Sequence, residues 1–371
     1  MCNHVVLKQE RELVKPRTQL HGIEICEHGG KVESDKKGGV IDFSANLNPY
    51  GPPDFVYDVI KEAMAEISLY PDTESRELRG KISKKIGCEE EEVLVGAGVS
   101  ELIQLVALSF VKNRALLPKH TYGEYEVAAK MMGAKIKRVE MPGLRVYPEL
   151  IEEEMEPDDV VFICNPNNPT GQYLGKKEME QILEAAERAD ALVVVDEAYV
   201  DFVRDAFPSH DFSTRNMIIL RSLTKSFAIP GVRIGYAISS AEIISAMRKV
   251  KAPWSVDAFA QKVGEAAIED ADFLAETREK IERSKGRMEA RLRALNLHIH
   301  SDANFYILDV GKAGEVKREL LTHGLLVRDC TSFGLPSHIR FSVRTEEENE
   351  RLIVIAKCKE EIEKCKNTFS F

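Results

Sequence analysis

Lys225 lies in a segment whose side chains could hold an aldehyde and a phosphate together. Residues 221–227 read Arg-Ser-Leu-Thr-Lys-Ser-Phe, and Arg233 follows eight residues after the lysine. A lysine amine can form a Schiff base with an aldehyde. The hydroxyls of Ser222 and Thr224, with the Arg233 guanidinium, can bind a phosphate. The alternative, an ordinary charged surface loop, is less favoured because residues 227–230 are largely apolar.

Two upstream segments supply groups that an aromatic cofactor would need. Asp196 follows an apolar run, and its carboxylate could pair with a protonated pyridine nitrogen; alone, it would be read as a helix N-cap. Tyr199 and Asn168 could both reach a phenolic oxygen on the same ring, although a core tyrosine and a turn asparagine are the ordinary interpretations. An amine, an acid and a phosphate site in one pocket are the requirements of pyridoxal phosphate (PLP).

A phosphate seat and a stacking ring come earlier in the chain. The sequence Gly-Ala-Gly-Val-Ser at 96–100 follows a predicted strand and opens a predicted helix. Free N–H groups at Gly98, Val99 and Ser100 could therefore hold a phosphate, although a simple strand–helix turn fits equally well. Tyr122 could stack on the pyridine ring or be a packed aromatic residue. Each motif alone is modest evidence, but their order along the chain favours a PLP site.

Apolar strands alternate with amphipathic helices through the middle of the chain. The predicted strands cover residues 93–96, 160–164, 191–195, 217–220 and 234–238, and the predicted helices cover 100–111 and 176–189. Fully apolar strands between helices predict a parallel sheet covered on both faces. Ligands bind at the carboxyl ends of such strands, which is where Asn165, Asp196 and Ser222 follow.

The C-terminal part predicts a second, smaller α/β unit. Residues 256–295 are mostly helical in pattern. The predicted elements beyond them are strands at 305–310, 325–327 and 339–343 and helices at 313–322 and 346–365, in a βαβ-type order. We therefore predict an N-terminal arm with part of the small domain at 1–45, a large PLP-binding domain at 46–275, and a small C-terminal domain at 276–371.

Composition limits the classes of partner. The 371 residues carry a net charge of −10, with 51 Lys and Arg against 61 Asp and Glu, which argues against a nucleic-acid surface. No apolar run approaches the roughly 20 residues of a membrane span, and the charged first 20 residues lack the apolar core of a signal peptide. We expect a cytoplasmic protein that binds neither nucleic acid nor membrane.

Seven scattered cysteines suit reduced thiols. The pair Cys358 and Cys365 is better explained as part of a solvated helix than as a metal site.

The order of these motifs resembles the fold-type-I PLP enzymes of the aspartate aminotransferase superfamily, from about residue 28 to 357. The resemblance implies an α/β fold, with a mostly parallel seven-stranded sheet in the large domain and a smaller α/β C-terminal domain. Two subgroups are similar to the chain. One is histidinol-phosphate aminotransferase, and the other is L-threonine-O-3-phosphate decarboxylase, which makes the aminopropanol phosphate linker of cobalamin.

Several short sequence segments resemble those of the decarboxylases more than those of the aminotransferases. They are His-Gly-Gly at 28–30, DFSANLNP at 42–49, LRSLTKSFAI at 220–229, PWSV at 253–256 and VRDC at 327–330. The aminotransferases more usually carry a NENP-type motif at this place, with glutamate at the position of Leu47. The tail beyond residue 357 has no counterpart in the resemblance.

The resemblance also implies roles for single residues. Arg340 should bind the substrate α-carboxylate, with Asn168 nearby. The residues implied for the substrate phosphate pocket are His28, Asn48, Arg328 and Arg344. Tyr70, in Leu-Tyr-Pro-Asp at 69–72, should reach the cofactor phosphate of a partner subunit, which implies a homodimer with shared active sites. Without the resemblance, His28 would be read as a loop residue and Arg340 as a strand residue facing solvent.

The implied reaction is decarboxylation of L-threonine O-3-phosphate, a phosphorylated amino acid. Lys225, Asp196 and Tyr199 would be the catalytic residues, with Asp196 keeping the ring nitrogen protonated and Lys225 donating a proton to Cα. Amino transfer from histidinol phosphate to 2-oxoglutarate is the first alternative. A non-catalytic PLP-binding regulator is the second, disfavoured because Lys225, Asp196 and Arg340 are all present.

Overall fold

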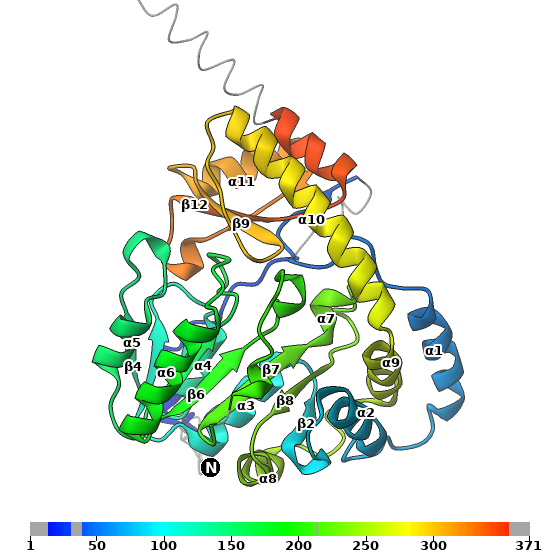
Figure 1. Cartoon of the computed structure of the whole chain (residues 1–371), viewed down its shortest axis with the longest axis vertical. Coiled ribbons are helices and arrows are strands. Elements are labelled where there is room, and N and C mark those ends of the chain that lie inside the picture. Colours follow the sequence, from blue (N-terminus) through cyan, green and yellow to red (C-terminus); the bar gives the residue numbers. More distant parts are fainter. Residues whose placement is uncertain (1–13, 31–38, 213, 356–371) are drawn as a thin grey trace, which may run out of the picture.

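A seven-stranded sheet forms the centre of the molecule (Figure 1). The computed structural model describes residues 14–30, 39–212 and 214–355. The strand order is β2-β8-β7-β6-β5-β3-β4. The strands are β2 (Val93–Gly96), β3 (Arg114–Pro118), β4 (Lys135–Val139), β5 (Val160–Cys164), β6 (Leu192–Asp196), β7 (Met217–Ser222) and β8 (Gly235–Ile238). The predicted α/β class and the mostly parallel seven-stranded sheet are confirmed.

One strand runs against the others. β8 pairs antiparallel with both β7 and β2, whereas its apolar sequence predicts a parallel strand. Between β7 and β8 lie only the short helix α7 (Leu223–Ser226) and the residues up to 234. A parallel return needs a crossover of a dozen or more residues, usually with a longer helix. Apolar character predicts burial on both faces, but it does not specify strand direction.

Helices cover both faces of the sheet, as the alternation of side chains requires. Along β6, Val193 and Val195 lie in one apolar core and Val194 lies in the other. The first core is covered by α1 (Phe55–Ala63), α2 (Arg76–Ile86), α5 (Pro148–Glu154), α6 (Lys176–Ala189) and α9 (Ala258–Glu269). The second is covered by α3 (Val99–Phe110), α4 (Glu124–Met131) and α8 (Ala241–Val250).

A smaller layer lies beyond the carboxyl ends of the parallel strands, at the top of Figure 1. The long helix α10 (Ala271–Ala294) runs from beside α9 into this layer (Figure 1). Its strands are β1 (Ile41–Asp42), β9 (Phe305–Asp309), β10 (Leu325–Leu326), β11 (Arg328–Asp329) and β12 (His338–Ser342), with helix α11 (Ala313–Thr322) between β9 and β10. The boundary predicted at 275/276 falls within α10, and the domain division stays a prediction.

The predicted βαβ-type order is present in this layer, with β12 lying between its two parallel strands. β9 and β11, which α11 separates along the chain, both pair antiparallel with β12, so they are parallel to one another with β12 between them. The N-terminal segment joins the layer, because β1 pairs with β10 and Phe43 is buried in the same core as Phe305 and Phe341. Residues 346–355 are helical, and Cys358 and Cys365 lie outside the described residues. In the described part of the chain, no helix has the length and apolar character to cross a membrane.

Candidate active site

Lys225 lies on a single helical turn that follows β7 directly. Ser222 caps this turn: its Oγ accepts a hydrogen bond from the backbone N–H of Thr224 at 3.3 Å and lies 2.8 Å from Thr224 Oγ1. Burial, together with the Arg340 and Arg233 guanidinium groups, lowers the pKa of the Lys225 ammonium group to about 8. A sizeable fraction of this amine is therefore neutral near neutral pH, as a nucleophilic lysine requires.

Asp196 is the last residue of β6, and its side chain is 3% exposed. The hydroxyl of Tyr125 donates to its Oδ2 at 2.6 Å, and the backbone N–H of Ala198 donates to its Oδ1 at 3.0 Å. Burial nevertheless raises the pKa of the Asp196 carboxyl to about 6. A cationic partner in the cavity would offset this cost, which suits the predicted pairing with a protonated ring nitrogen.

Arg340 is buried and held in a fixed orientation. Its Nη1 donates to Asn168 Oδ1 and its Nη2 donates to the Ser44 carbonyl at 2.8 Å. The guanidinium lies over the Phe305 and Phe333 rings, 5.5 and 5.9 Å from their centroids. Its Nε has no hydrogen-bond partner among the described residues, so the group retains a donor for an anionic ligand.

The aromatic residues lie around the same space. Tyr199 is buried edge-on against Phe305, with ring centroids 5.0 Å apart, and burial raises the pKa of its phenol to about 12. Burial also raises the pKa of the Tyr122 phenol, which lies beside Ser100. Both rings therefore stay neutral donors at physiological pH.

The predicted phosphate site is built around a glycine whose left-handed backbone and contact with Arg233 disfavour a larger residue. Gly98 precedes α3 with φ +80°, and a Cβ there would lie 2.7 Å from Arg233 Nη2. The Arg233 guanidinium therefore lies directly over the start of α3, where backbone N–H groups are free. Its Nη1 is held by the Pro230 carbonyl at 3.1 Å.

Gly98→Ala should weaken PLP binding by about tenfold, because the new methyl group would strain the left-handed backbone and displace Arg233. The matched control is Gly231→Ala, since a Cβ at Gly231 would meet nothing within 4 Å. Titration of the cofactor-free proteins with PLP, followed by absorbance, measures both affinities. Equal affinities for the two variants would contradict the role of this turn as a phosphate seat.

His28 and Arg328 lie on the side of the cavity formed by the N-terminal segment and β11. His28 Nε2 is 3.0 Å from Glu124 Oε1, and its ring centroid is 6.3 Å from that of Tyr122. Arg328 is 5% exposed, and its Nη2 donates to the Glu27 carbonyl and to Ser332 Oγ, both at 2.7 Å. These contacts position the two groups predicted for the substrate phosphate, and that role stays a prediction.

One cavity of about 1290 Å³ brings most of the predicted residues together. Those that line it are His28, Val99, Ser100, Tyr122, Asn168, Asp196, Tyr199, Ser222, Thr224, Lys225, Arg233, Arg328 and Arg340. Gly98 lies directly beneath Arg233. Tyr70 is absent from this lining and is 80% exposed.

Asn48 and Arg344 are placed elsewhere than the resemblance implies. The Asn48 amide donates to the Ser226 carbonyl at 2.8 Å and to Thr277 Oγ1 at 2.9 Å, and its backbone N–H donates to the Lys225 carbonyl. Asn48 therefore fastens the lysine turn to α10 and does not line the substrate pocket. Arg344 pairs with Glu348, four residues later, at 3.0 Å and does not line the cavity.

Two residues of the site were not predicted from the sequence. Asn46 is 2% exposed and lines the cavity; its amide lies beside the Tyr199 phenol, yet it makes no hydrogen bond of standard geometry with the described residues. A buried unpaired amide costs free energy unless a ligand satisfies it, so Asn46 is a candidate ligand contact. Tyr125 is the second, and its position three residues after Tyr122 was the only signal in the sequence.

The residues present fit PLP. An amine with a lowered pKa and a buried carboxylate line one cavity, which also contains a cationic seat and the unpaired Asn46 and Arg340 donors. These are the contacts that the aldehyde, the ring nitrogen, the phosphate and a bound substrate would require. In the described part of the chain, no group of three or more His, Cys, Asp or Glu side chains stands close enough to hold a metal ion.

Comparison with known proteins agrees with this site. The family "Aminotransferase class I and II" matches residues 38–355. A protein of Caldanaerobacter subterraneus subsp. tengcongensis named "Putative threonine-phosphate decarboxylase" is 36% identical over 344 residues, which cover 88% of this chain and 92% of that protein. Histidinol-phosphate aminotransferase 2 of Archaeoglobus fulgidus is 35% identical over 319 residues, covering 85% of this chain and 91% of that protein.

A solved structure supports the fold. L-threonine-O-3-phosphate decarboxylase from Porphyromonas gingivalis matches with a TM-score of 0.77 over 86% of this chain and 99% of that one. Its identity of 24% establishes likeness of fold alone. From the family match, the two relatives and this fold, the chain belongs to the aminotransferase class I and II family of fold-type-I, PLP-dependent enzymes.

Proposed function

We propose that the chain decarboxylates L-threonine O-3-phosphate, giving the aminopropanol phosphate used as the linker of cobalamin. The observation that carries the proposal is the pair of buried arginines, Arg328 and Arg340, each 5% exposed in the cavity that contains Lys225. Two guanidinium groups suit a substrate with two anionic groups. L-Threonine O-3-phosphate carries a carboxylate and a phosphate on one molecule. Histidinol phosphate carries only the phosphate, and in amino transfer the carboxylates would come from the second substrate, 2-oxoglutarate, so the assays below decide between the two reactions.

Bound PLP supplies an electron sink for the electron pair released at the substrate Cα. Asp196, which accepts a hydrogen bond from Tyr125, would pair with the protonated ring nitrogen when ionised. Arg340 binds the carboxylate, and Arg328 with His28 orients the phosphate. Rotation about the bond between Cα and the amino nitrogen decides which bond at Cα breaks. By holding the carboxylate and the phosphate, Arg340, Arg328 and His28 would fix this rotation and direct the reaction toward loss of CO2.

Lys225 would return a proton to Cα after CO2 leaves. With a pKa near 8, its amine can exist in either protonation state near neutral pH, so it can both accept and donate a proton. The Asn48 hydrogen bonds keep the turn that carries Lys225 fixed against α10. Tyr199 and Asn168 line the same cavity, and Asn168 accepts a hydrogen bond from Arg340.

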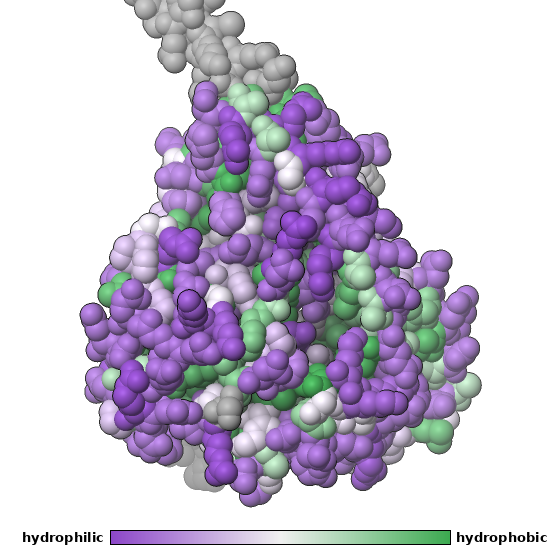
Figure 2. Space-filling model, viewed as in Figure 1, coloured by the Kyte–Doolittle hydropathy of each residue, from purple (hydrophilic) through white to green (hydrophobic). Residues whose placement is uncertain are grey.

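The proposal includes a homodimer with shared active sites. Tyr70 is too far from its own cavity to line it, although it is a large, exposed aromatic residue. Other exposed apolar residues come from the same part of the chain: Tyr57, Met64, Ile67 and Leu69. Figure 2 shows hydrophobic residues reaching the surface beside α1, on the right of the view. A surface of this kind suits a second copy of the chain.

Purified, PLP-loaded protein should release CO2 from L-threonine O-3-phosphate in the absence of any keto acid. Release of CO2 and formation of the amine measure the reaction. L-Threonine without the phosphate is the control substrate, and its kcat/KM should be at least about 100-fold lower because the charged clamp is then unused. No CO2 from the phosphorylated substrate would overturn the proposal.

Amino transfer is the second candidate, because relatives named histidinol-phosphate aminotransferase are 30–35% identical. The same protein incubated with histidinol phosphate and 2-oxoglutarate distinguishes the two reactions. Glutamate formed here, with no CO2 from L-threonine O-3-phosphate, would assign the chain to the aminotransferases.

A further inference from the structure

Tyr70 is stacked on the single tryptophan of the chain. The ring centroids of Tyr70 and Trp254 lie 4.7 Å apart, with an angle of 30° between the planes. Both rings face solvent, with exposed fractions of 80% and 47%, and neither residue lines the cavity. The pair therefore contributes little to the core of its own subunit, so packing of the core does not explain why the two rings are stacked.

The backbone of Trp254 is itself unusual. Its φ is +56°, in the left-handed region that bulky residues rarely adopt. Such a conformation persists only where the surroundings impose it, and it is common at functional sites. Here it lies between α8 and α9 and turns an aromatic ring outward against Tyr70.

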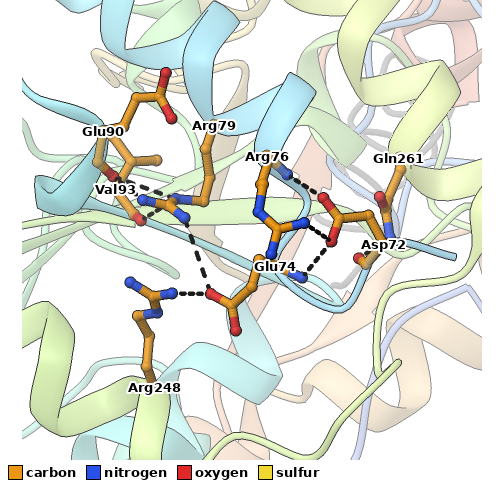
Figure 3. A network of polar contacts seen from close by, with 8 residues as sticks. All are labelled: Asp72, Glu74, Arg76, Arg79, Glu90, Val93, Arg248 and Gln261. Atoms are coloured by element: carbon orange, nitrogen blue, oxygen red, sulfur yellow. Dashed lines mark hydrogen bonds and ion pairs between the residues drawn. The ribbon is translucent and has the colours of Figure 1, made fainter.

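The chain just after Tyr70 is firmly fixed (Figure 3). The Asp72 carboxylate accepts hydrogen bonds from the backbone N–H groups of Glu74 and Arg76, at 3.1 and 2.9 Å. The Asp72 carbonyl accepts a hydrogen bond from Gln261 Nε2 of α9 at 2.9 Å. The base of the loop that carries Tyr70 is therefore tied to both α2 and α9.

A second set of contacts ties the same loop to α8 and to the sheet. Glu74 pairs with Arg248 of α8 and lies 3.9 Å from Arg79 Nη1. Arg79 is 5% exposed and donates to the carbonyls of Glu90 and Val93, at the start of β2. Figure 3 shows these side chains converging on one network. These contacts fix the chain from Asp72 onward, two residues after Tyr70, and Trp254 contacts the Tyr70 side chain itself.

We propose that Trp254 is a positioning residue: by stacking on Tyr70 it holds that side chain in the orientation in which it enters the active site of a second copy of the chain. The inference rests on the homodimer with shared active sites that forms part of the proposed function. It assigns a purpose to the Pro-Trp-Ser-Val segment at 253–256, whose residues take no part in the cavity.

A double-mutant cycle on PLP affinity tests the proposal. Trp254→Ala should raise the dissociation constant of PLP about three- to tenfold, the range expected from an exposed aromatic pair. Trp254→Phe should recover most of the affinity. In a Tyr70→Ala background, Trp254→Ala should add nothing, because Trp254 acts only through Tyr70. Additive effects would overturn the proposal, as would an unchanged affinity in Trp254→Ala.

Hybrid dimers test whether the effect crosses between subunits. In the first hybrid, one subunit carries Lys225→Ala and the other carries Trp254→Ala. In the second, both substitutions lie in one subunit and the other is unchanged. The active lysine site of the first hybrid receives an intact Tyr70, so it should need less PLP for half-maximal turnover than that of the second. The proposal would be overturned if the first hybrid needed as much PLP as the second for half-maximal turnover, or more.

Controls separate this inference from the reaction itself. Tyr147→Ala removes another exposed tyrosine, outside both the cavity and the Tyr70 loop, and should leave PLP affinity unchanged. If Trp254→Ala does not fold, Trp254→Leu replaces it in the cycle. PLP titrations do not depend on the substrate, so a failed decarboxylase assay leaves the cycle valid. A monomeric native protein in sedimentation would end both the dimer and this proposal.

Discussion

Lys225→Ala should lower the turnover rate by at least about 10³-fold. A positioned acid or base alone contributes a factor of about 10² to 10⁴ to the rate, and the nucleophilic amine is lost as well. The variant still folds, because the turn keeps its Ser222 cap and its Asn48 bonds through backbone atoms. Initial rates with the accepted substrate measure the loss. The absorbance of bound PLP should change to that of the free aldehyde.

Lys85→Ala is the matched control for this prediction. Lys85 is another lysine whose pKa is lowered, chiefly by burial of its amine, but its Nζ donates to the Ile268 carbonyl at 2.6 Å, away from the cavity. Its replacement should leave turnover within about twofold of the native protein, as expected of a change away from the reacting groups. If Lys225→Ala kept a tenth of the native rate, the assignment of the reactive lysine would be wrong.

The residues at the ends of the parallel strands were predictable for a physical reason. Asp196 ends β6 and Ser222 ends β7, and neighbouring parallel strands place their carboxyl ends at one edge of the sheet. Lys225 follows within a single turn, so its position is nearly fixed by that of Ser222. The antiparallel direction of β8 was not predictable from its apolar sequence, since burial on both faces is common to both directions.

Asn46 and Asn48 show where sequence reasoning failed. In an extended segment, residues two apart face the same side, and the resemblance assigned the pocket to Asn48. The backbone N–H of Leu47 donates to the Ala45 carbonyl at 2.9 Å, so the chain turns between the two asparagines. Asn46 then lines the cavity and Asn48 bonds to α10.

Tyr125 and Arg344 show two different limits. The hydrogen bond from Tyr125 to Asp196 joins residues 71 positions apart, and only the packing of α4 on the sheet creates it. Arg344 lies just before the helical segment that begins at residue 346 and pairs with Glu348 inside it, a contact that the spacing alone does not separate from a role in the pocket.

Asp196→Asn is expected to lower activity and to raise the stability of the cofactor-free protein. Asparagine cannot carry the negative charge that pairs with the ring nitrogen, so turnover should fall by about 10²- to 10⁴-fold, corresponding to the roughly 3–5 kcal/mol of a broken buried ion pair. PLP affinity of the native protein should weaken as the pH falls below about 6, where Asp196 becomes protonated. The variant should lack the part of this dependence that arises from Asp196.

The stability change has a definite pH dependence. Because the folded-state pKa is raised from 3.8 to about 6, ionisation of Asp196 opposes folding: the cost is absent below about pH 4, grows up to about pH 6 and is then constant. A shift of about two pKa units corresponds to about 3 kcal/mol at most. Thermal unfolding of the cofactor-free proteins should therefore show a larger advantage for the variant at pH 8 than at pH 5.

Asp190→Asn is the control, since Asp190 is an exposed residue at the end of α6 with a left-handed backbone that asparagine accepts. It should change neither turnover nor the pH dependence of unfolding. Lower activity with higher stability is the expected signature of a buried charge retained for a ligand rather than for the fold. An Asp196→Asn protein that was less stable than the native one at pH 8, or equally active, would remove Asp196 from that role.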